Sequence, residues 1–179
     1  EEMLAPLQVV RAVPGRVAEM LESGAVQVGI VPVATLAAHP EWPTVPGLGI
    51  ASEGPVRSVL VLARRPLEEA VTLVADPASR TSNVLARLWL EHRLGRRLPM
   101  TAGSPDLRAR LEAGEPTVVI GDQALFSAEE TVERIDLGAA WTEWTGRPFV
   151  FAVWAGPGAA DPAVADALTR CYARNEARI

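Results

Sequence analysis

The stretch DPASRTSNVL at positions 76–85 gathers more hydrogen-bonding side chains than its local structure requires. It places the hydroxyls of Ser79, Thr81 and Ser82 and the amide of Asn83 around the expected first turn of a helix. One such side chain is an ordinary N-terminal cap, because it satisfies a backbone N–H group that has no partner within the helix. A helix N-terminus also attracts anions through its unpaired N–H groups and its dipole. The stretch therefore predicts either a cap with surface hydroxyls or a site for a carboxylate or phosphate.

The types of the remaining reactive residues exclude several kinds of chemistry. All 17 basic residues are Arg, so a Schiff-base or pyridoxal lysine and a P-loop lysine are absent from this chain. The single cysteine, Cys171, excludes a disulfide within the chain. His39 and His92 lie far apart, and neither has a second His or Cys at ligand spacing. We therefore predict no metal site and no cofactor.

Composition and charge indicate a globular protein with a small-molecule partner. The 179 residues carry a formal net charge of −5 and have a pI near 5.1, whereas nucleic-acid-binding domains show a basic stripe and a pI above about 9. No apolar run approaches the roughly 18 residues of a membrane span. The opening EEMLAPLQVV has neither an initiator Met nor the pattern of a signal peptide, so we expect a fragment of a longer chain.

Helix and strand patterns alternate along the chain, which is typical of an α/β protein. Helical spacing before Gly24 and at 82–94, 137–146 and 161–177 alternates with apolar strand patterns at 26–31, 48–52, 58–65, 70–76, 116–120 and 147–156. Most strand patterns are near-continuous in Val, Ile and Leu, which favours a buried parallel sheet. Ligands of such folds bind beyond the carboxyl ends of the strands. Three polar segments follow strands and are candidates to converge on one cleft: ASEG at 51–54, PASRTS at 77–82 and GDQAL at 121–125.

Five longer segments carry a family resemblance: GIVPVATL, GIASEGPVRSVLVLARRPLEE, ADPASRTSNVLARL, VVIGDQALF and IDLGAAWTEWTGRPFVFAVWAG. In this order and spacing they resemble the chorismate dehydratase family of menaquinone biosynthesis, which serves the futalosine pathway. The resemblance implies an α/β, two-lobed fold of the type II periplasmic-binding-protein kind, with a ligand cleft between the lobes. Lobe 1 is then expected at residues 1–64 plus 152–179 and lobe 2 at 65–151, joined by crossing segments near 63–67 and 149–153.

The resemblance also implies a function, which is dehydration of chorismate to 3-enolpyruvylbenzoate by a cytoplasmic hydro-lyase that needs no cofactor. Chorismate is a small dicarboxylate, so the site must hold two carboxylates and assist the departure of a ring hydroxyl. Two parts of the family pattern have no counterpart here, namely an N-terminal strand followed by an Asn-bearing loop, and the C-terminal helices. No signal in the sequence indicates the oligomeric state.

With the resemblance included, the residue types give seven residues of the polar segments a role in this site. Ser79, Thr81, Ser82 and Asn83 form one carboxylate-binding group, and Ser52 and Gly54 form a second, for which a plain Gly-Pro turn is the alternative. Asp122 either assists proton transfer and the leaving hydroxyl or caps a helix. In a further alternative, the enolpyruvyl carboxylate of the substrate removes the ring proton itself.

Two other functions are compatible with the same fold. A solute-binding protein would capture a small carboxylate in the same cleft without chemistry, because one fold serves receptors and enzymes alike. The sister enzyme of the pathway, which makes a dihydroxynaphthoate, resembles this family in fold. The SEGPVRSV and SRTS segments look more like the dehydratase branch.

Overall fold

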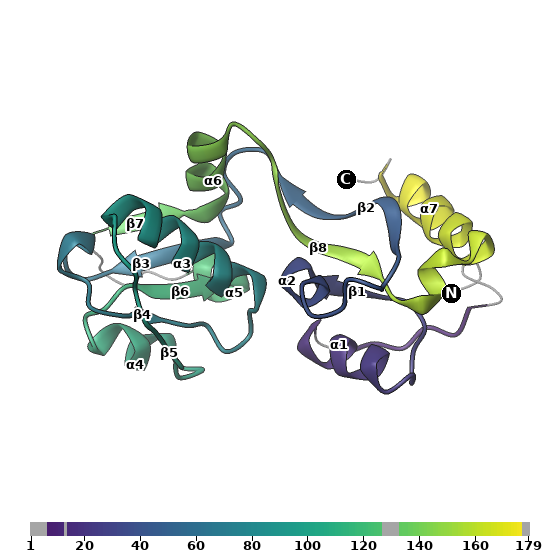
Figure 1. The fold of residues 1–179 in the computed structure, drawn as a ribbon, viewed down its shortest axis with the longest axis horizontal. Helices are drawn as coiled ribbons and strands as arrows, with labels where there is room; N and C mark the ends of the chain where they lie inside the picture. Colours follow the sequence, from purple (N-terminus) through teal and green to yellow (C-terminus); the bar gives the residue numbers. More distant parts are fainter. Residues whose placement is uncertain (1–6, 13, 127–132, 177–179) are drawn as a thin grey trace. The chain divides into compact units, whose positions relative to one another are not determined.

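The computed structural model describes residues 7–12, 14–126 and 133–176 (Figure 1). It divides the chain into two compact units, each containing its own sheet. The first unit comprises Glu1–Ile50 and Val150–Ile179, and the second comprises Ala51–Phe149.

The chain passes between the units at Ile50–Ala51 and returns at Phe149–Val150. The first passage comes before β3 (Val59–Ala63), which is paired along both edges with strands of the second unit. The lobe bounds and crossing segments expected from the sequence stay a prediction.

The first unit is built on a three-stranded sheet with the order β1-β8-β2. Its strands are β1 (Gly29–Pro32), β2 (Thr44–Ser52) and β8 (Phe149–Ala155), and β1 runs antiparallel to β8. Its helical segments are α1 (Pro14–Glu22), α2 (Val33–Leu36), η3 (Pro157–Ala160) and α7 (Pro162–Glu176). Ala18 and Leu21 of α1 pack on Val31 and Ala155 of the sheet, while Leu168 of α7 joins a second buried cluster.

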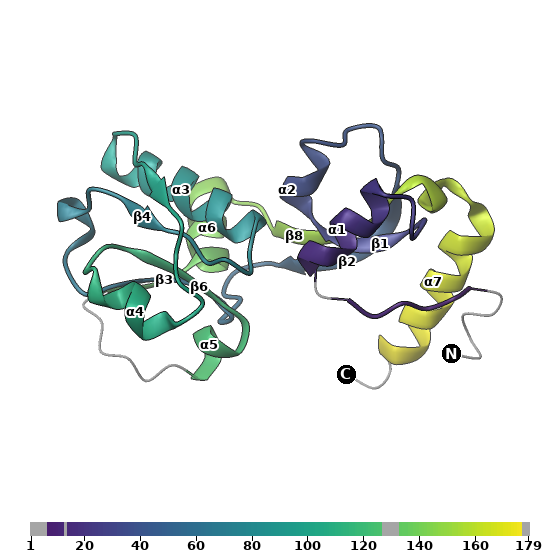
Figure 2. The ribbon, with the colours of Figure 1, turned by 90° about the horizontal axis from the view of Figure 1, so that it is seen from below.

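The second unit is built on a five-stranded sheet with the order β5-β4-β6-β3-β7. Its strands are β3, β4 (Leu73–Val74), β5 (Met100–Thr101), β6 (Thr117–Ile120) and β7 (Glu133–Asp136). Its helical segments are η2 (Leu67–Glu69), α3 (Thr81–Leu94), α4 (Leu107–Glu112), α5 (Gly121–Phe126) and α6 (Leu137–Thr145). Figure 2 shows α3 and α6 on one face of this sheet and α4 and α5 on the other.

Helices cover both faces of β3, and all five of its residues are buried. On one face, Leu60 and Leu62 of β3 pack with Leu107 and Leu111 of α4 in one buried cluster. This double burial explains why VLVLA is an uninterrupted apolar run, because neither face of the strand meets water.

The direction of β3 differs from the sequence prediction of a parallel sheet. β4 runs parallel to β5 and β6, but β3 runs antiparallel to both of its neighbours, β6 and β7. The sheet is therefore mixed. An uninterrupted apolar run reports burial on two faces, and burial does not depend on the direction in which the strand runs.

The strand directions bring the polar segments to one end of this sheet. The antiparallel register places Val59, at the start of β3, opposite Ile120, at the end of β6, and Leu60 opposite Asp136, at the end of β7. β4 runs in the same direction as β6, so the chain beyond Val74 leads to this end as well. The segments 52–58, 76–83, 121–123 and 136–139 consequently meet at one end of the sheet.

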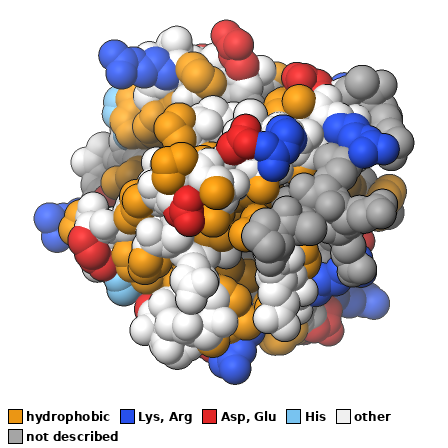
Figure 3. All heavy atoms as spheres, turned by 90° about the vertical axis from the view of Figure 1, so that its right-hand side faces the viewer, with side chains coloured by type: hydrophobic (Ala, Val, Ile, Leu, Met, Phe, Trp, Pro, Cys, Tyr) orange, Lys and Arg blue, Asp and Glu red, His pale blue; other side chains and the backbone are white. Residues whose placement is uncertain are grey.

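Charged side chains are intermixed on the face of the molecule in Figure 3. Blue and red side chains are scattered there among apolar and uncharged ones. No helix within the described ranges is both long enough and apolar enough to cross a membrane.

Candidate functional site

The hydroxyl-rich stretch forms the start of α3, as the sequence predicts. The helix begins at Thr81, and the side chain of Arg80 at the N-cap position makes no capping hydrogen bond. The backbone N–H of Ser82 instead donates to Oγ of Ser79 at 3.1 Å. Ser79 therefore takes the capping role that one of these residues was expected to have.

Thr81 and Ser82 are polar residues of the first turn, yet both are buried: they are 5% and 4% exposed. Among the described residues we find no hydrogen bond to the hydroxyl of Ser82. The first turn of α3 contains no acidic side chain. The positive end of this helix dipole is consequently not neutralised from within its own turn.

Asn83 has a different role from its neighbours, because its amide closes the loop before the helix. Its Oδ1 accepts from the backbone N–H of Asp76 at 2.9 Å, and its Nδ2 donates to the carbonyl of Asp76 at 2.9 Å and to that of Ser79. These bonds use both ends of the amide. We therefore treat Asn83 as a residue that shapes the loop and no longer as a substrate ligand.

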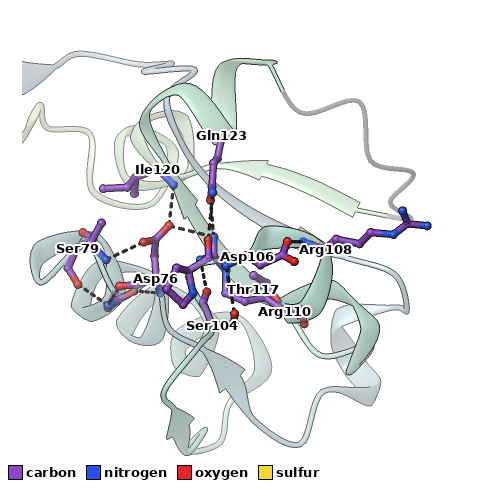
Figure 4. Close-up of polar contacts among 12 residues, drawn as sticks. Asp76, Ser79, Ser104, Asp106, Arg108, Arg110, Thr117, Ile120 and Gln123 are labelled. Atoms are coloured by element: carbon purple, nitrogen blue, oxygen red, sulfur yellow. Dashed lines mark hydrogen bonds and ion pairs between the residues drawn. The ribbon is translucent and has the colours of Figure 1, made fainter.

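Asp76 lies at the centre of the polar contacts in Figure 4, and it is only 3% exposed. Its Oδ1 accepts from the backbone N–H of Ala78 at 2.9 Å. Its Oδ2 accepts from the backbone N–H of Ile120 at 3.2 Å and from Nη2 of Arg110 at 3.2 Å. The carboxylate thus joins the start of α3 to the end of β6.

Arg110 of α4 is 2% exposed and extends the same network. Its Nη1 donates to the carbonyl of Ser104 at 2.7 Å, and its Nη2 also donates to Oε1 of Gln123 on α5 at 3.0 Å. Gln123 in turn donates from Nε2 to the carbonyl of Pro105 at 3.1 Å. Figure 4 shows these side chains converging from different segments.

The loop beside this network has room for glycine alone at position 103. A Cβ built on Gly103 would lie 2.1 Å from the carbonyl oxygen of Ala75 and 2.6 Å from Cδ of Arg110. Contacts this short do not occur in folded proteins without displacement of one partner. Gly103 therefore allows the loop to lie directly against both neighbours.

Sequence reasoning did not identify Asp76 or Arg110 as members of the site. Asp76 was assigned to the end of a strand, and the segment around Arg110, which forms α4, was given no element. The one local signal is the acidic side chain that directly follows the apolar run TLVA, where burial forces a charged group to find partners. Its partner Arg110 lies 34 residues away.

Asp122 lies in the first turn of α5 and is exposed. The preceding Gly121 has a φ of +61° and donates its N–H to the carbonyl of Ser58 at 2.8 Å. Within the described residues the Asp122 carboxylate forms no hydrogen bond. The helix-cap alternative therefore finds no supporting contact, and the proton-transfer role remains a prediction.

The second predicted carboxylate group, Ser52 and Gly54, lies against α6. Gly54 has a φ of +83° and donates its backbone N–H to Oγ1 of Thr142 at 3.0 Å. The Ser52 hydroxyl is shielded from solvent and has no hydrogen-bond partner among the described residues. It lies 2.7 Å from the position of a Cβ built on Gly138. The N–H of Gly54 thus already donates to Thr142. Of the two residues, Ser52 is the one whose polar group, the hydroxyl, has no partner among the described residues.

The N-terminus of α6 is already occupied by a carboxylate of the chain itself. Asp136 accepts hydrogen bonds from the backbone N–H groups of Gly138 and Ala139 at 2.9 and 3.0 Å. It also accepts from those of Val56 at 3.1 Å and Arg57 at 2.6 Å. Three helices start at this end of the sheet. Asp136 neutralises the start of α6, Asp122 lies in the first turn of α5, and the first turn of α3 has no acidic side chain.

A family described as "Menaquinone biosynthesis" matches residues 2–176. The chain belongs to this family. It is 30% identical over 171 residues to a chorismate dehydratase of Thermus thermophilus, covering 85% of this chain and 62% of that protein. It is 34% identical over 106 residues to a chorismate dehydratase of Campylobacter jejuni, covering 59% of this chain and 34% of that protein. The family resemblance expected from the sequence is confirmed.

This member of the family spans less than two thirds of the length of either relative. Its fold is similar to that of a crystallised protein from Archaeoglobus fulgidus, with a TM-score of 0.65 at 16% identity over 94% of this chain and 63% of that one. It is also similar to a periplasmic substrate-binding protein of an ABC transporter from Coxiella burnetii, with a TM-score of 0.50 at 11% identity, over 90% and 77% of the two chains. The α/β fold of the periplasmic-binding-protein kind is thereby confirmed.

The described residues contain no group of three or more His, Cys, Asp or Glu side chains that could hold a metal ion. Hydroxyls and backbone N–H groups gather at the sheet end, beside the exposed Asp122 carboxylate and the carboxylates of Asp76 and Asp136, which already accept hydrogen bonds from the chain. The hydroxyls and N–H groups are suited to hold and orient an anion through hydrogen bonds.

Proposed function

We propose that the protein of this chain is a chorismate dehydratase, which removes water from chorismate and leaves 3-enolpyruvylbenzoate in menaquinone biosynthesis. Membership of the menaquinone-biosynthesis family and the names of two relatives support this proposal. As a biosynthetic enzyme that acts on a small dianion, it would work in the cytoplasm. The proposal concerns the full-length protein, because this chain spans 62% of the Thermus relative.

The observation that carries the proposal is the start of α3. A helix of 14 residues begins there without an acidic side chain in its first turn. Ser82 is 4% exposed, and its hydroxyl makes no hydrogen bond among the described residues. Because the helix dipole and the hydroxyl both favour an anion, we assign one carboxylate of the substrate to this position.

The reaction requires orientation more than a strongly charged catalyst. The bond between the ring and its hydroxyl breaks, a proton leaves the ring carbon that bears the ether oxygen, and the two together amount to one water. The electron pair of the broken C–H bond completes the aromatic ring, so no oxidant or reductant is needed. Hydroxyls and N–H groups hold the carboxylates while the aromatic product provides the driving force.

We propose that the carboxylate of Asp122 takes part in the proton transfer. It is exposed in the first turn of α5, and its segment meets that of Ser82 at the same end of the sheet. A group without structural hydrogen bonds is available to accept or donate a proton. The alternative is that the enolpyruvyl carboxylate of the substrate removes the proton, in which case Asp122 is dispensable.

The second carboxylate of the substrate needs another binding group. The start of α6 does not offer one, because Asp136 already accepts hydrogen bonds from Gly138 and Ala139 there. From the second predicted group we keep Ser52, whose hydroxyl has no partner in the described part of the chain, and omit Gly54, whose N–H donates to Thr142.

The test is incubation of the full-length protein with chorismate, followed by ultraviolet absorbance and proton NMR. We expect the diene signals of chorismate to disappear and an aromatic product that retains the enolpyruvyl group to appear. Chorismate that binds but stays intact would favour the solute-binding alternative. Conversion of a cyclic futalosine substrate in place of chorismate would favour the sister enzyme.

A further inference from the structure

The ion pair between Asp76 and Arg110 is buried almost completely. The side chains are 4% and 1% exposed, and Arg110 Nη2 lies 3.2 Å from Asp76 Oδ2. Removing two charges from water costs more than the pair itself returns unless further hydrogen bonds satisfy both groups. Here the further hydrogen bonds join the pair to backbone groups and to the Gln123 side chain around the proposed site, while Nε of Arg110 is buried without a partner among the described residues.

The Asp76 carboxylate holds two backbone groups that are 42 positions apart, Ala78 and Ile120. Ala78 lies in the loop that enters α3, and Ile120 is the last residue of β6 before α5. One carboxylate thus sets the distance between the starts of the two helices. Ser82 comes from the first of these helices and Asp122 from the second.

The Arg110 guanidinium provides the second half of the connection. It reaches Ser104 in the loop after β5 and Gln123 in the first turn of α5. Gln123 is the neighbour of Asp122 in sequence. The position of the Asp122 backbone therefore depends on Ile120 on one side and on Gln123 on the other, and both are held by the ion pair.

We propose that Asp76 and Arg110 are positioning residues of the dehydratase reaction. Together they hold the start of α3, which binds the substrate carboxylate, and the start of α5, which carries Asp122, in one fixed relation. This inference rests on the proposed function for its catalytic meaning. Its structural part, that the pair orders both helix starts, is measurable without any substrate.

The experiment uses four variants of the full-length protein and two controls. Arg110→Met and Asp76→Asn each leave one buried charge without its partner, whereas the double variant Asp76→Asn/Arg110→Met removes both charges. Arg110→Lys keeps the charge but loses the forked donor geometry. Arg108→Met changes an exposed side chain on the same helix. Val61→Ala lowers stability at a fully buried site of β3 and removes no polar group.

Two quantities are measured for each variant, at a temperature well below its unfolding transition. The first is amide hydrogen exchange at residues 78–84 and 120–123, and the second is kcat/KM for chorismate. We expect exchange there to rise about 10-fold or more and kcat/KM to fall about 30-fold or more in all four network variants, because orientation is lost. Arg108→Met and Val61→Ala are expected to keep kcat/KM within about 3-fold of wild type.

The double variant separates positioning from simple stabilisation. Since removal of both charges leaves no unpaired buried ion, we expect it to be more stable than either single variant. If its kcat/KM returns to the wild-type value together with its stability, the pair acts through stability alone and the inference is wrong. If the single variants do not fold, the double variant and Arg110→Lys decide the question.

Failure of the proposed function has a different signature. In that case the wild-type protein leaves chorismate unchanged, while the exchange data still report whether the pair orders the two helix starts. Unchanged exchange at 78–84 and 120–123 in the folded network variants would overturn the inference whatever the wild-type protein does to chorismate.

Discussion

Ser79 and Ser82 lie three positions apart, and the hydroxyl of Ser79 accepts a hydrogen bond from the backbone N–H of Ser82 at 3.1 Å. The two serines therefore have separate roles at the start of α3. The hydroxyl of Ser79 is used by the helix, whereas that of Ser82 finds no partner among the described residues. Replacement of each serine by alanine should consequently affect different measurements.

Replacement of Ser82 by Ala should reduce catalysis with little effect on stability. It removes one hydrogen bond to a charged carboxylate, worth about 1.5 to 3 kcal/mol, so kcat/KM should fall roughly 10- to 150-fold. Steady-state kinetics with chorismate and the full-length protein are the measurement. A near-native kcat/KM would remove Ser82 from the carboxylate site.

Replacement of Ser79 by Ala should mainly reduce stability. The loss of the cap should lower the free energy of unfolding by about 1 kcal/mol, as measured by urea denaturation. We expect kcat/KM to fall less than in Ser82→Ala, because the amide of Asn83 still holds the loop. The assignment of roles is wrong if the two alanine variants have the same kinetic and stability profile.

Replacement of Asp122 by Asn tests proton transfer. Asp122 is exposed, so the substitution should leave the unfolding transition unchanged while kcat falls on the order of 100-fold. The matched control is Asp106→Asn, which changes an exposed aspartate that serves as the N-cap of α4. An unaffected kcat in Asp122→Asn would leave proton removal by the substrate's own carboxylate as the better account.

Replacement of Asn83 by Ala should destabilise the protein more than replacement of its neighbour. The buried amide makes hydrogen bonds to Asp76 and Ser79, and their loss leaves backbone groups unpaired, at a cost of about 2 to 4 kcal/mol. Val84→Ala, at an adjacent exposed position of the same helix, should change the free energy of unfolding by about 1 kcal/mol at most. Similar values for the two variants would show that the loop does not depend on Asn83.

The pKa of Tyr172 provides a check on α7 in the first unit. A hydrogen bond from its hydroxyl to Glu176 and the charge of that carboxylate raise the pKa of Tyr172 above its ordinary value of 10.0. A raised pKa in the folded state stabilises the protonated form, so this contribution is present below about pH 10 and is lost as the pH rises through the folded pKa. Tyr172 is the one tyrosine of the chain, so absorbance at alkaline pH follows it directly. In Glu176→Gln the titration should move back toward the ordinary value.

The sequence alone was sufficient for features that depend on neighbouring residues. The hydroxyl-rich stretch was predicted to open a helix at 82–94, and α3 spans Thr81–Leu94 and ends at Gly95 with a φ of +66°. Caps, turns and helical spacing are local interactions, so they can be recognised within one stretch of chain. The same holds for the five segments that indicated the family.

Tertiary structure decided the features that depend on partners far away in the chain. The apolar run of β3 shows that the strand is buried, but the antiparallel direction of β3 is visible only beside β6 and β7. Asp76 and Arg110 are separated by 34 residues, and nothing in either stretch identifies the other as its partner.

The starts of α3 and α6 also could not be told apart from the sequence. The sequences before α3 and α6 both offer polar side chains for a helix N-terminus. At α6 the carboxylate of Asp136 accepts from its own helix and also from Val56, 80 residues earlier. At α3 the Asp76 carboxylate is directed away from the first turn, to Ala78, Ile120 and Arg110. The fold alone determined which helix start keeps its positive end available for a ligand, because that depends on where each carboxylate finds its donors.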